Sequence, residues 1–229
     1  MDNLMITKGA KVERLALDDA ELREINRYTT REFTADEVFT FKVALCDDKV
    51  DREHERFTGE ALEALAKLYV GKPVIADHDR KAGSQCARIY SAAVEAAGAA
   101  KRLVAKCYMV RSERAKDLIT EIEGGIKKEV SVGCRVEKVC CSICGADNRK
   151  VLCEHVPGRE YGGRFCHFRL EEPTDAYEVS FVAVPAQPAA GVVKQYGGVK
   201  PLEPDTEKAL LAQRLRAAEG FLYINKQEE

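Results

Sequence analysis

The sequence lacks any run of the roughly 18 to 20 apolar residues that a helix needs to cross a bilayer. It also lacks a signal-like start, because the segment MDNLMITKGAKVERLALDDAELREI is rich in charged residues. Charge of one sign is not in excess: 36 Lys and Arg face 38 Asp and Glu, a net charge of -2. Without a global attraction to nucleic acid or anionic lipid, we expect a cytoplasmic protein with protein partners, no direct nucleic acid and no membrane.

A zinc hydrolase and a disulfide-linked domain are also disfavoured by what the sequence lacks. The chain has four histidines and no His-Glu-x-x-His motif, the usual sequence pattern of a zinc hydrolase. Its nine cysteines are an odd number. In a chain without an export signal, we expect them to stay reduced or to bind metal rather than to form a disulfide framework.

What the sequence does contain is a series of strand-like segments. Its 229 residues, 45% of them hydrophobic, are enough to bury a substantial core. Alternating or continuous apolar runs predict strands at 39–47, 73–76, 86–96, 102–110, 128–139 and 176–185. Helical spacing predicts helices within 11–38 and at 60–70, 113–125 and 206–222. Strands that mostly follow one another favour an α+β fold with a barrel-like or sandwich core over a doubly wound parallel sheet.

The same pattern suggests four parts along the chain. We expect an N-terminal helical segment at 1–38, a core at 39–193, a Cys/His-rich insertion within that core at 140–167, and a linker with a C-terminal helix at 194–229.

One serine and one histidine stand out as a candidate catalytic pair. Serine hydrolysis needs a hydroxyl beside a base, with backbone N–H groups to hold the developing oxyanion. Ser131 lies inside an apolar strand, and Gly133 after it would allow close approach of a substrate carbonyl. A strand serine alone is more often a hydrogen-bonded filler. His78 ends a predicted buried strand, while the other histidines lie in a charged loop or among cysteines, so His78 is the natural base.

Four sequence blocks resemble the tailed-phage prohead (capsid-maturation) serine proteases. GKPVIADHDRKAGSQCARI (71–89) resembles the family's histidine motif, and EVSVGCRV (129–136) resembles its serine motif. FTFKVALCDDKVDREHERFTGEAL (39–62) resembles the opening strand and loop, and YEVSFVAVPAQPAAGV (177–192) resembles the closing strand. The blocks agree with the family in order and spacing over residues 39–193.

This resemblance carries expectations about fold and biological role. Prohead proteases are similar in fold to the herpesvirus assemblins, which implies a mostly antiparallel β-barrel core with flanking helices. The implied partners are the major capsid protein, the scaffold protein and the portal or procapsid interior. The implied activity is cleavage of the scaffold, or of the scaffolding extension of the capsid protein, and of the protease itself. This would take place inside the assembling procapsid, in the cytoplasm of a bacterial host. A homodimer is also expected.

The implied mechanism is acyl transfer from Ser131, with His78 moving the proton and backbone amides near Gly133 and Cys134 holding the oxyanion. A third residue should orient the imidazole. The family's closing strand carries an acid there, which favours Glu178 and leaves Asp175 as the alternative.

The cysteine-rich segment predicts a structural zinc site. Thiolates and imidazoles at short spacing suit tetrahedral zinc, and Gly145 permits the tight turn that follows a Cys-x-x-Cys pair. Four protein ligands would close the site, so zinc would be structural and catalysis would need no cofactor. Spacing alone does not settle which four residues bind. We favour Cys141, Cys144, Cys153 and His155, out of a candidate set made up of Cys140, Cys141, Cys144, Cys153, His155, Cys166 and His167.

Two alternatives compete with the serine protease. The first is a proteolytically inactive, zinc-bearing capsid assembly protein that keeps the protease fold and docks through its zinc module; the intact Ser131 and His78 argue against it. The second, a zinc hydrolase, would need an open metal site with a carboxylate base beside it, and ranks last.

Overall fold

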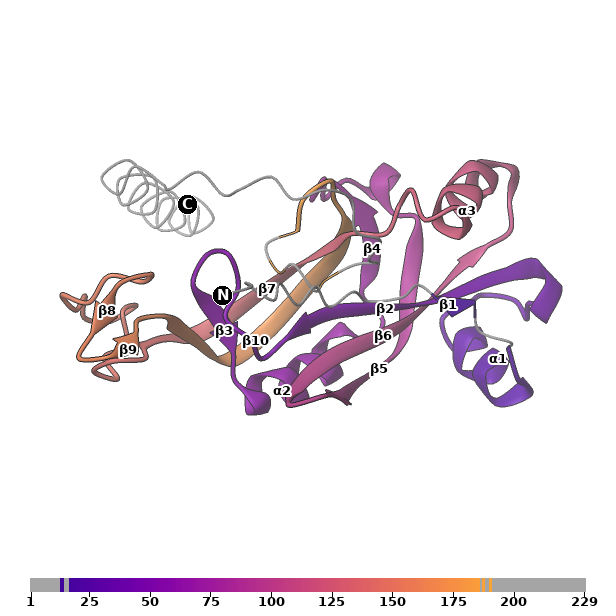
Figure 1. The fold of residues 1–229 in the computed structure, drawn as a ribbon. Coiled ribbons are helices and arrows are strands. Elements are labelled where there is room, and N and C mark those ends of the chain that lie inside the picture. The colour runs from indigo at the N-terminus through magenta and orange to yellow at the C-terminus, as the bar shows by residue number, and fades with distance from the viewer. Residues whose placement is uncertain (1–12, 15–16, 186, 188–189, 191–229) are drawn as a thin grey trace, which may run out of the picture. The chain divides into compact units, whose positions relative to one another are not determined.

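The computed structural model describes residues 13–14, 17–185, 187 and 190 of the chain (Figure 1). The fold is α+β, as predicted, and most of its strands pair antiparallel. An eight-stranded sheet has the order β1-β2-β6-β5-β4-β10-β3, and β7 joins it by pairing with β10. Its strands are β1 (Glu13–Arg14), β2 (Val38–Asp47), β3 (Glu55–Phe57), β4 (Pro73–Ala76), β5 (Ala87–Ala97), β6 (Ala100–Val110), β7 (Val130–Cys141) and β10 (Phe168–Phe181). The short hairpin strands β8 (Glu160–Tyr161) and β9 (Arg164–Phe165) form a second, two-stranded sheet.

The predicted barrel is wrong, because the sheet is not closed. Within the described residues β7 pairs only with β10, and β2 pairs only with β1 and β6. Closure would require a ladder between β2 and β7, and none is present there. Instead, residues of these strands, among them Cys46 and Val132, line a cavity. The backbone of Asp47, at the end of β2, is hydrogen-bonded by the side chain of Gln187. At the start of β7, the Val130 amide donates to the Ala190 carbonyl.

Helix α2 (Gly59–Tyr69) forms where its apolar spacing predicts. Thr58 caps its N-terminus by accepting a hydrogen bond from the Ala61 amide at 3.2 Å. Leu62, Leu65 and Tyr69 recur along one face at helical spacing and are completely buried. Burial of each such side chain stabilises the fold by about 1.5–3 kcal/mol. The helix packs against β10, β5 and β6 and thereby supports the centre of the sheet.

The N-terminal helix is shorter than its sequence pattern suggests. Helix α1 covers only Asp19–Asn26, with Asp18 as its N-cap. The Asn26 side chain ends it, because its amide donates to the Phe33 carbonyl and its oxygen accepts from the Phe33 amide. This pair of hydrogen bonds turns the chain back before it enters β2. The helix predicted at 113–125 forms as a 3-10 turn (Glu113–Ala115) followed by α3 (Lys116–Glu123); further 3-10 turns cover Ala35–Glu37 and Ala82–Ser84.

The longest paired strands are β7 and β10, which carry the Cys/His-rich insertion between them. Figure 1 shows the hairpin β8–β9 at the far tip of this ribbon. β10 begins at Phe168, before the predicted start at 176, because residues 168–173 continue the ladder with β7. The predicted linker and C-terminal helix at 194–229 lie outside the described residues. No helix in the part of the chain that the structure describes is long and apolar enough to cross a membrane.

Candidate functional site

The register of β7 against β10 brings four candidate site residues together. Ser131 pairs with Ser180 and Gly133 pairs with Glu178 across the antiparallel ladder. Because side chains alternate between the two faces of a strand, residues two apart share a face. Glu178 and Ser180 therefore project on the face of the ribbon that also carries Ser131.

His78 reaches this face from a tight turn at the end of β4. That strand runs parallel to the end of β10, with Ile75 opposite Ser180. Asp77 and His78 both adopt left-handed backbone angles, with φ of 53° and 54°. For residues other than glycine such angles each cost of the order of 1–3 kcal/mol, so surrounding contacts must hold them. The His78 amide donates to Ser180 Oγ at 2.9 Å, which is one such contact.

Glu178 orients the imidazole of His78. Its Oε1 lies 2.9 Å from His78 Nδ1, and the Ser180 hydroxyl donates to Oε2 at 2.8 Å. The Glu178 residue is only 2% exposed, whereas the His78 side chain is 43% exposed. A carboxylate at Nδ1 favours the tautomer with the proton on that nitrogen, which leaves Nε2 as the base.

The alternative orienting acid lies elsewhere. Asp175 Oδ1 forms an ion pair with Lys72 Nζ at 3.0 Å. Of the two acids considered from sequence, the structure places Glu178 and not Asp175 against His78.

Gly133 is needed for a different reason from the one that its motif suggests. A Cβ at this position would lie 2.3 Å from Glu178 Oε1, far inside van der Waals contact. The space above its Cα is filled by the Glu178 carboxylate, so the missing side chain at residue 133 makes room for this carboxylate. Arg80 lies nearby, with one guanidinium nitrogen 3.4 Å from the same Cβ position.

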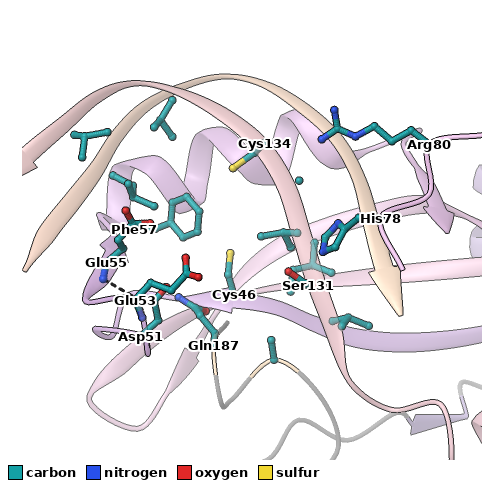
Figure 2. Close-up of a pocket in the computed structure, with 18 residues that line it drawn as sticks. Cys46, Asp51, Glu53, Glu55, Phe57, His78, Arg80, Ser131, Cys134 and Gln187 are labelled. Atoms are coloured by element: carbon teal, nitrogen blue, oxygen red, sulfur yellow. Dashed lines mark hydrogen bonds between the residues drawn. The ribbon is translucent and has the colours of Figure 1, made fainter. Parts of the chain in front are cut away.

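Ser131 and His78 line one cavity of about 520 Å³. Figure 2 shows both side chains at the same end of this hollow. No hydrogen bond joins Ser131 Oγ to His78 in the described structure; such contacts are often long without substrate and tighten when it binds. Ser131 and His78 therefore line the same cavity without a direct hydrogen bond between them.

Arg80 is the sole Lys or Arg among the described residues that line the cavity. Its guanidinium carbon lies 4.7 Å from the centre of the Tyr177 ring, a cation–π contact that fixes the side chain. Neither Arg80 nor Ser180 is among the site residues expected from the sequence. A signal for Ser180 was present, because a residue two positions from Glu178 in a strand shares its face.

Two cysteines in the cavity are poor candidates for the nucleophile. Burial raises the pKa of Cys134 to about 11, and burial raises the pKa of Cys46 well above its ordinary value. Both thiols are therefore protonated at neutral pH, and the thiol is the unreactive form. Among the described residues that line the cavity, Ser131 is the sole one with a hydroxyl group.

A second cluster lies in the insertion and can hold a metal ion. Ligand atoms of Cys141, Cys144, Cys153 and His155 all lie within 4.8 Å of one another. Tetrahedral zinc with bonds of about 2.3 Å to sulfur needs ligand separations of about 3.8 Å, so small adjustments suffice. These four are the favoured ligands from sequence.

Local contacts in the insertion fit metal binding. His155 Nδ1 is buried and has no hydrogen-bond partner, a state that a bound cation would relieve. The Ile143 amide donates to Cys141 Sγ at 3.4 Å, and Gly145 adopts a positive φ of 78° in the turn. Three sulfurs and one nitrogen form one of the donor sets that structural zinc sites use.

The remaining candidates from the set of seven are not part of this cluster. Cys166 Sγ lies 4.0 Å from Cys141 Sγ, and burial raises its pKa to about 12. Cys140 Sγ faces Glu171 Oε2, and His167 Nδ1 faces the Phe165 carbonyl. All nine cysteines are free thiols.

Comparison with known proteins yields no relative: no family model matches the chain, and no curated protein or solved structure is significantly similar to it. Function is therefore inferred from the site itself and from the sequence motifs.

Proposed function

We propose that the chain is a serine endopeptidase with Ser131 as nucleophile, His78 as general base and acid, and Glu178 as the acid that orients His78. The observation that carries this proposal is the 2.9 Å contact between His78 Nδ1 and a buried Glu178 carboxylate. It leaves Nε2 free in the cavity that Ser131 also lines. A serine, a histidine and a buried acid in this relation are the parts of an acyl-transfer site.

The reaction has two halves. His78 Nε2 takes the Ser131 proton as Oγ bonds to the scissile carbonyl carbon, and the carbonyl oxygen becomes an oxyanion. The C–N bond then breaks, and His78 gives the proton to the leaving amine. In the second half a water oxygen bonds to the acyl carbon while His78 takes its proton; the acyl–oxygen bond to Ser131 then breaks, and His78 returns the proton to Ser131 Oγ. The oxyanion is stabilised by backbone amides near Gly133 and Cys134, with Arg80 as a nearby positive charge.

The substrate class follows from the sequence motifs rather than from the fold. We propose that the enzyme cuts the scaffold protein, or the scaffolding extension of the major capsid protein, and also itself, during prohead maturation. This assignment extends the resemblance of the blocks around His78, Ser131 and Glu178 to prohead proteases, and it places the enzyme within the assembling procapsid of a phage-infected bacterium. An assemblin-like relation and a homodimer belong to the same proposal.

The metal cluster is proposed to hold zinc in a structural role. Cys141, Cys144, Cys153 and His155 would occupy all four positions of a tetrahedral site, which leaves none for an activated water. Zinc would cross-link a segment that is poor in apolar residues and so fix the tip of the β7–β10 ribbon. Catalysis is assigned to Ser131 and His78 alone.

The test is co-expression of the chain with the capsid and scaffold proteins of the same virus, followed by intact-mass measurement of every protein. Wild type should shorten its partner, and Ser131→Ala should leave the partner at full length. Ser112→Ala, which removes an exposed hydroxyl outside the cavity, is the matched control and should cut like wild type.

Reactivity of Ser131 provides a test that needs no known substrate. A fluorophosphonate probe should add one label per chain at Ser131, and His78→Ala should abolish the labelling. Assembled procapsids with uncut proteins and no label on wild type would reject the protease. That result would favour the inactive zinc-bearing assembly protein.

A further inference from the structure

The cavity that Ser131 and His78 line extends well beyond these two residues. Its volume of about 520 Å³ is in the range of about 300–1,000 Å³ typical of ligand sites. In Figure 2 His78 and Ser131 lie at one end, and Asp51, Glu53 and Glu55 lie at the other. Apolar side chains line the space, among them Leu45, Phe57, Val132, Val136, Val139 and Leu170.

The acidic end is built by a loop that precedes β3. Asp51 Oδ1 accepts hydrogen bonds from the amides of Glu53 and Glu55, each at 2.9 Å. These bonds hold the three acidic residues together beside the cavity. Burial, together with the smaller effect of the nearby Asp51 and Glu53 charges, raises the pKa of Glu55 to about 7. Within the described residues, no Lys, Arg or His side chain forms a salt bridge with Glu55.

The two ends of the cavity therefore differ in charge: one is acidic, and the other holds an arginine. Its one Lys or Arg among the described lining residues, Arg80, belongs to the His78 end, where it lies against Tyr177. A cation entering the other end would offset the repulsion that Asp51 and Glu53 exert on the Glu55 carboxylate. The apolar walls between the two ends suit a flexible hydrocarbon stem that carries such a cation.

We propose that this end of the cavity is a binding subsite for a lysine or arginine side chain of the peptide substrate. The inference rests on the proposed protease function and names the chemistry of its substrate. A peptide bound across Ser131 would place the stem of the basic residue along Phe57 and Val136 and its charged head beside Glu55. Specificity would thus come from β3 and its loop, while catalysis comes from β4, β7 and β10.

A bare metal ion fits this end less well than an extended cation. In the described part of the chain, the group of metal-ligating side chains that converge closely enough for an ion is the Cys/His cluster of the insertion. The three carboxylates do not form such a group, so their oxygens are spread over more space than an ion's coordination shell. A guanidinium or ammonium on a long stem can use several spread acceptors at once.

The experiment is cleavage of a peptide library by the full-length chain. A bacterial proteome is first digested with a Glu-specific protease, which does not cut at lysine or arginine and so leaves most of these residues within the peptides. The library is incubated with wild type or Ser131→Ala, and new termini are identified by mass spectrometry. We expect Ser131-dependent cuts with lysine or arginine enriched at one fixed position near the scissile bond.

Charge removal tests the assigned subsite. Glu55→Gln should lower kcat/KM for peptides with lysine at that position by about ten- to a hundredfold, as loss of a charged hydrogen bond implies. Peptides with leucine there should be affected much less. Glu53→Gln, at an exposed position of the same loop, is a second variant that should fold normally and shift the preference in the same direction. Glu63→Gln, on the exposed side of α2, is the matched control and should change nothing.

The two proposals fail in different ways. Ser131-dependent cleavage with no enrichment of lysine or arginine, or enrichment that persists in both Glu55→Gln and Glu53→Gln, overturns the basic subsite and leaves the protease intact. Absence of any Ser131-dependent cleavage overturns the protease, and the subsite falls with it.

Discussion

Gly133 lies directly opposite Glu178 in the β7–β10 ladder, so close that a Cβ on Gly133 would come within 2.3 Å of Glu178 Oε1. The same oxygen lies 2.9 Å from His78 Nδ1. The carboxylate is therefore held between the imidazole and the bare Cα of Gly133. The absence of a side chain at residue 133 is what gives the orienting acid its position.

Gly133→Ala should therefore destabilise the protein and displace Glu178. Because the neighbouring atom belongs to a buried carboxylate, relief requires movement of Glu178 away from His78. Overpacking of this kind costs about 1–3 kcal/mol, which corresponds to a fall in Tm of about 2–12 °C for a chain of this size. Thermal unfolding followed by circular dichroism measures the change.

Gly83→Ala is the control for this substitution. Nothing lies within 4 Å of a Cβ at Gly83, so its Tm should stay within about 1–2 °C of wild type. Equal Tm values for both variants would show that Glu178 has room to move without loss.

Glu178→Gln should slow the chemistry while the fold survives. Glutamine has the same shape but no charge, so it stabilises the imidazolium poorly and no longer fixes the tautomer with Nε2 free. In triads of this type, loss of the acid slows the reaction by about 10²–10⁴-fold. The rate of fluorophosphonate labelling at Ser131 reports this loss without a known substrate.

Asp175→Asn separates the two acids that the sequence left open. Asp175 forms an ion pair with Lys72 in which both side chains are substantially exposed, and such pairs contribute about 0–1 kcal/mol. The labelling rate should therefore stay near that of wild type. A slower rate in Asp175→Asn than in Glu178→Gln would reverse the assignment.

Local patterns in the sequence predicted the elements of this fold better than their assembly. The alternating run at 39–47 became β2, and the amphipathic run at 60–70 became α2. The barrel was wrong because closure depends on whether β2 and β7 pair, and neither strand's own pattern contains that information.

The candidate site shows the same division. The sequence singled out Ser131, His78 and Glu178, and the structure brings all three to one region. The role of Gly133 depends on the register with β10, and the approach of Arg80 depends on the turn after β4. Both are long-range relations that one sequence does not reveal.

One metal ion per chain should bind the insertion, and its loss should loosen residues 142–167. Metal analysis should find about one zinc in wild type and none in Cys144→Ser, because a structural site needs all four ligands. After chelation, trypsin should cut at Arg149 and Lys150 about tenfold faster or more, since these exposed positions lose their anchored backbone.

Two cysteine variants identify the ligand set. Cys140→Ser and Cys166→Ser should both retain zinc, because the Cys140 thiol faces Glu171 and Cys166 stands outside the four-residue cluster. Loss of zinc in Cys166→Ser would show that Cys166 takes the place of one of the four proposed ligands. Its sulfur lies close enough to do so, 4.0 Å from that of Cys141. Retention of zinc in Cys144→Ser would reject the proposed set of four ligands.

The acidic end of the cavity should make stability fall as pH rises toward neutrality. Burial and, to a smaller extent, the charges of Asp51 and Glu53 raise the pKa of Glu55 from 4.5 to about 7. Between these values the folded chain holds a proton that the unfolded chain has released. The stabilising contribution is therefore fully present below pH 4.5 and lost as pH rises through about 7.

Glu55→Gln isolates this effect, because glutamine does not titrate. The free energy of unfolding, measured with urea between pH 5 and 8, should decline more steeply in wild type than in Glu55→Gln, by an amount on the order of 1 kcal/mol after allowance for partial solvent exposure. All ionisable groups other than Glu55 are common to both proteins, so their contributions cancel in the difference. Glu63→Gln should follow the wild-type curve. Parallel curves for wild type and Glu55→Gln would mean that the pKa of Glu55 is not raised in the folded protein. The acidic end would then contain no unfavourable interaction for a basic side chain to relieve.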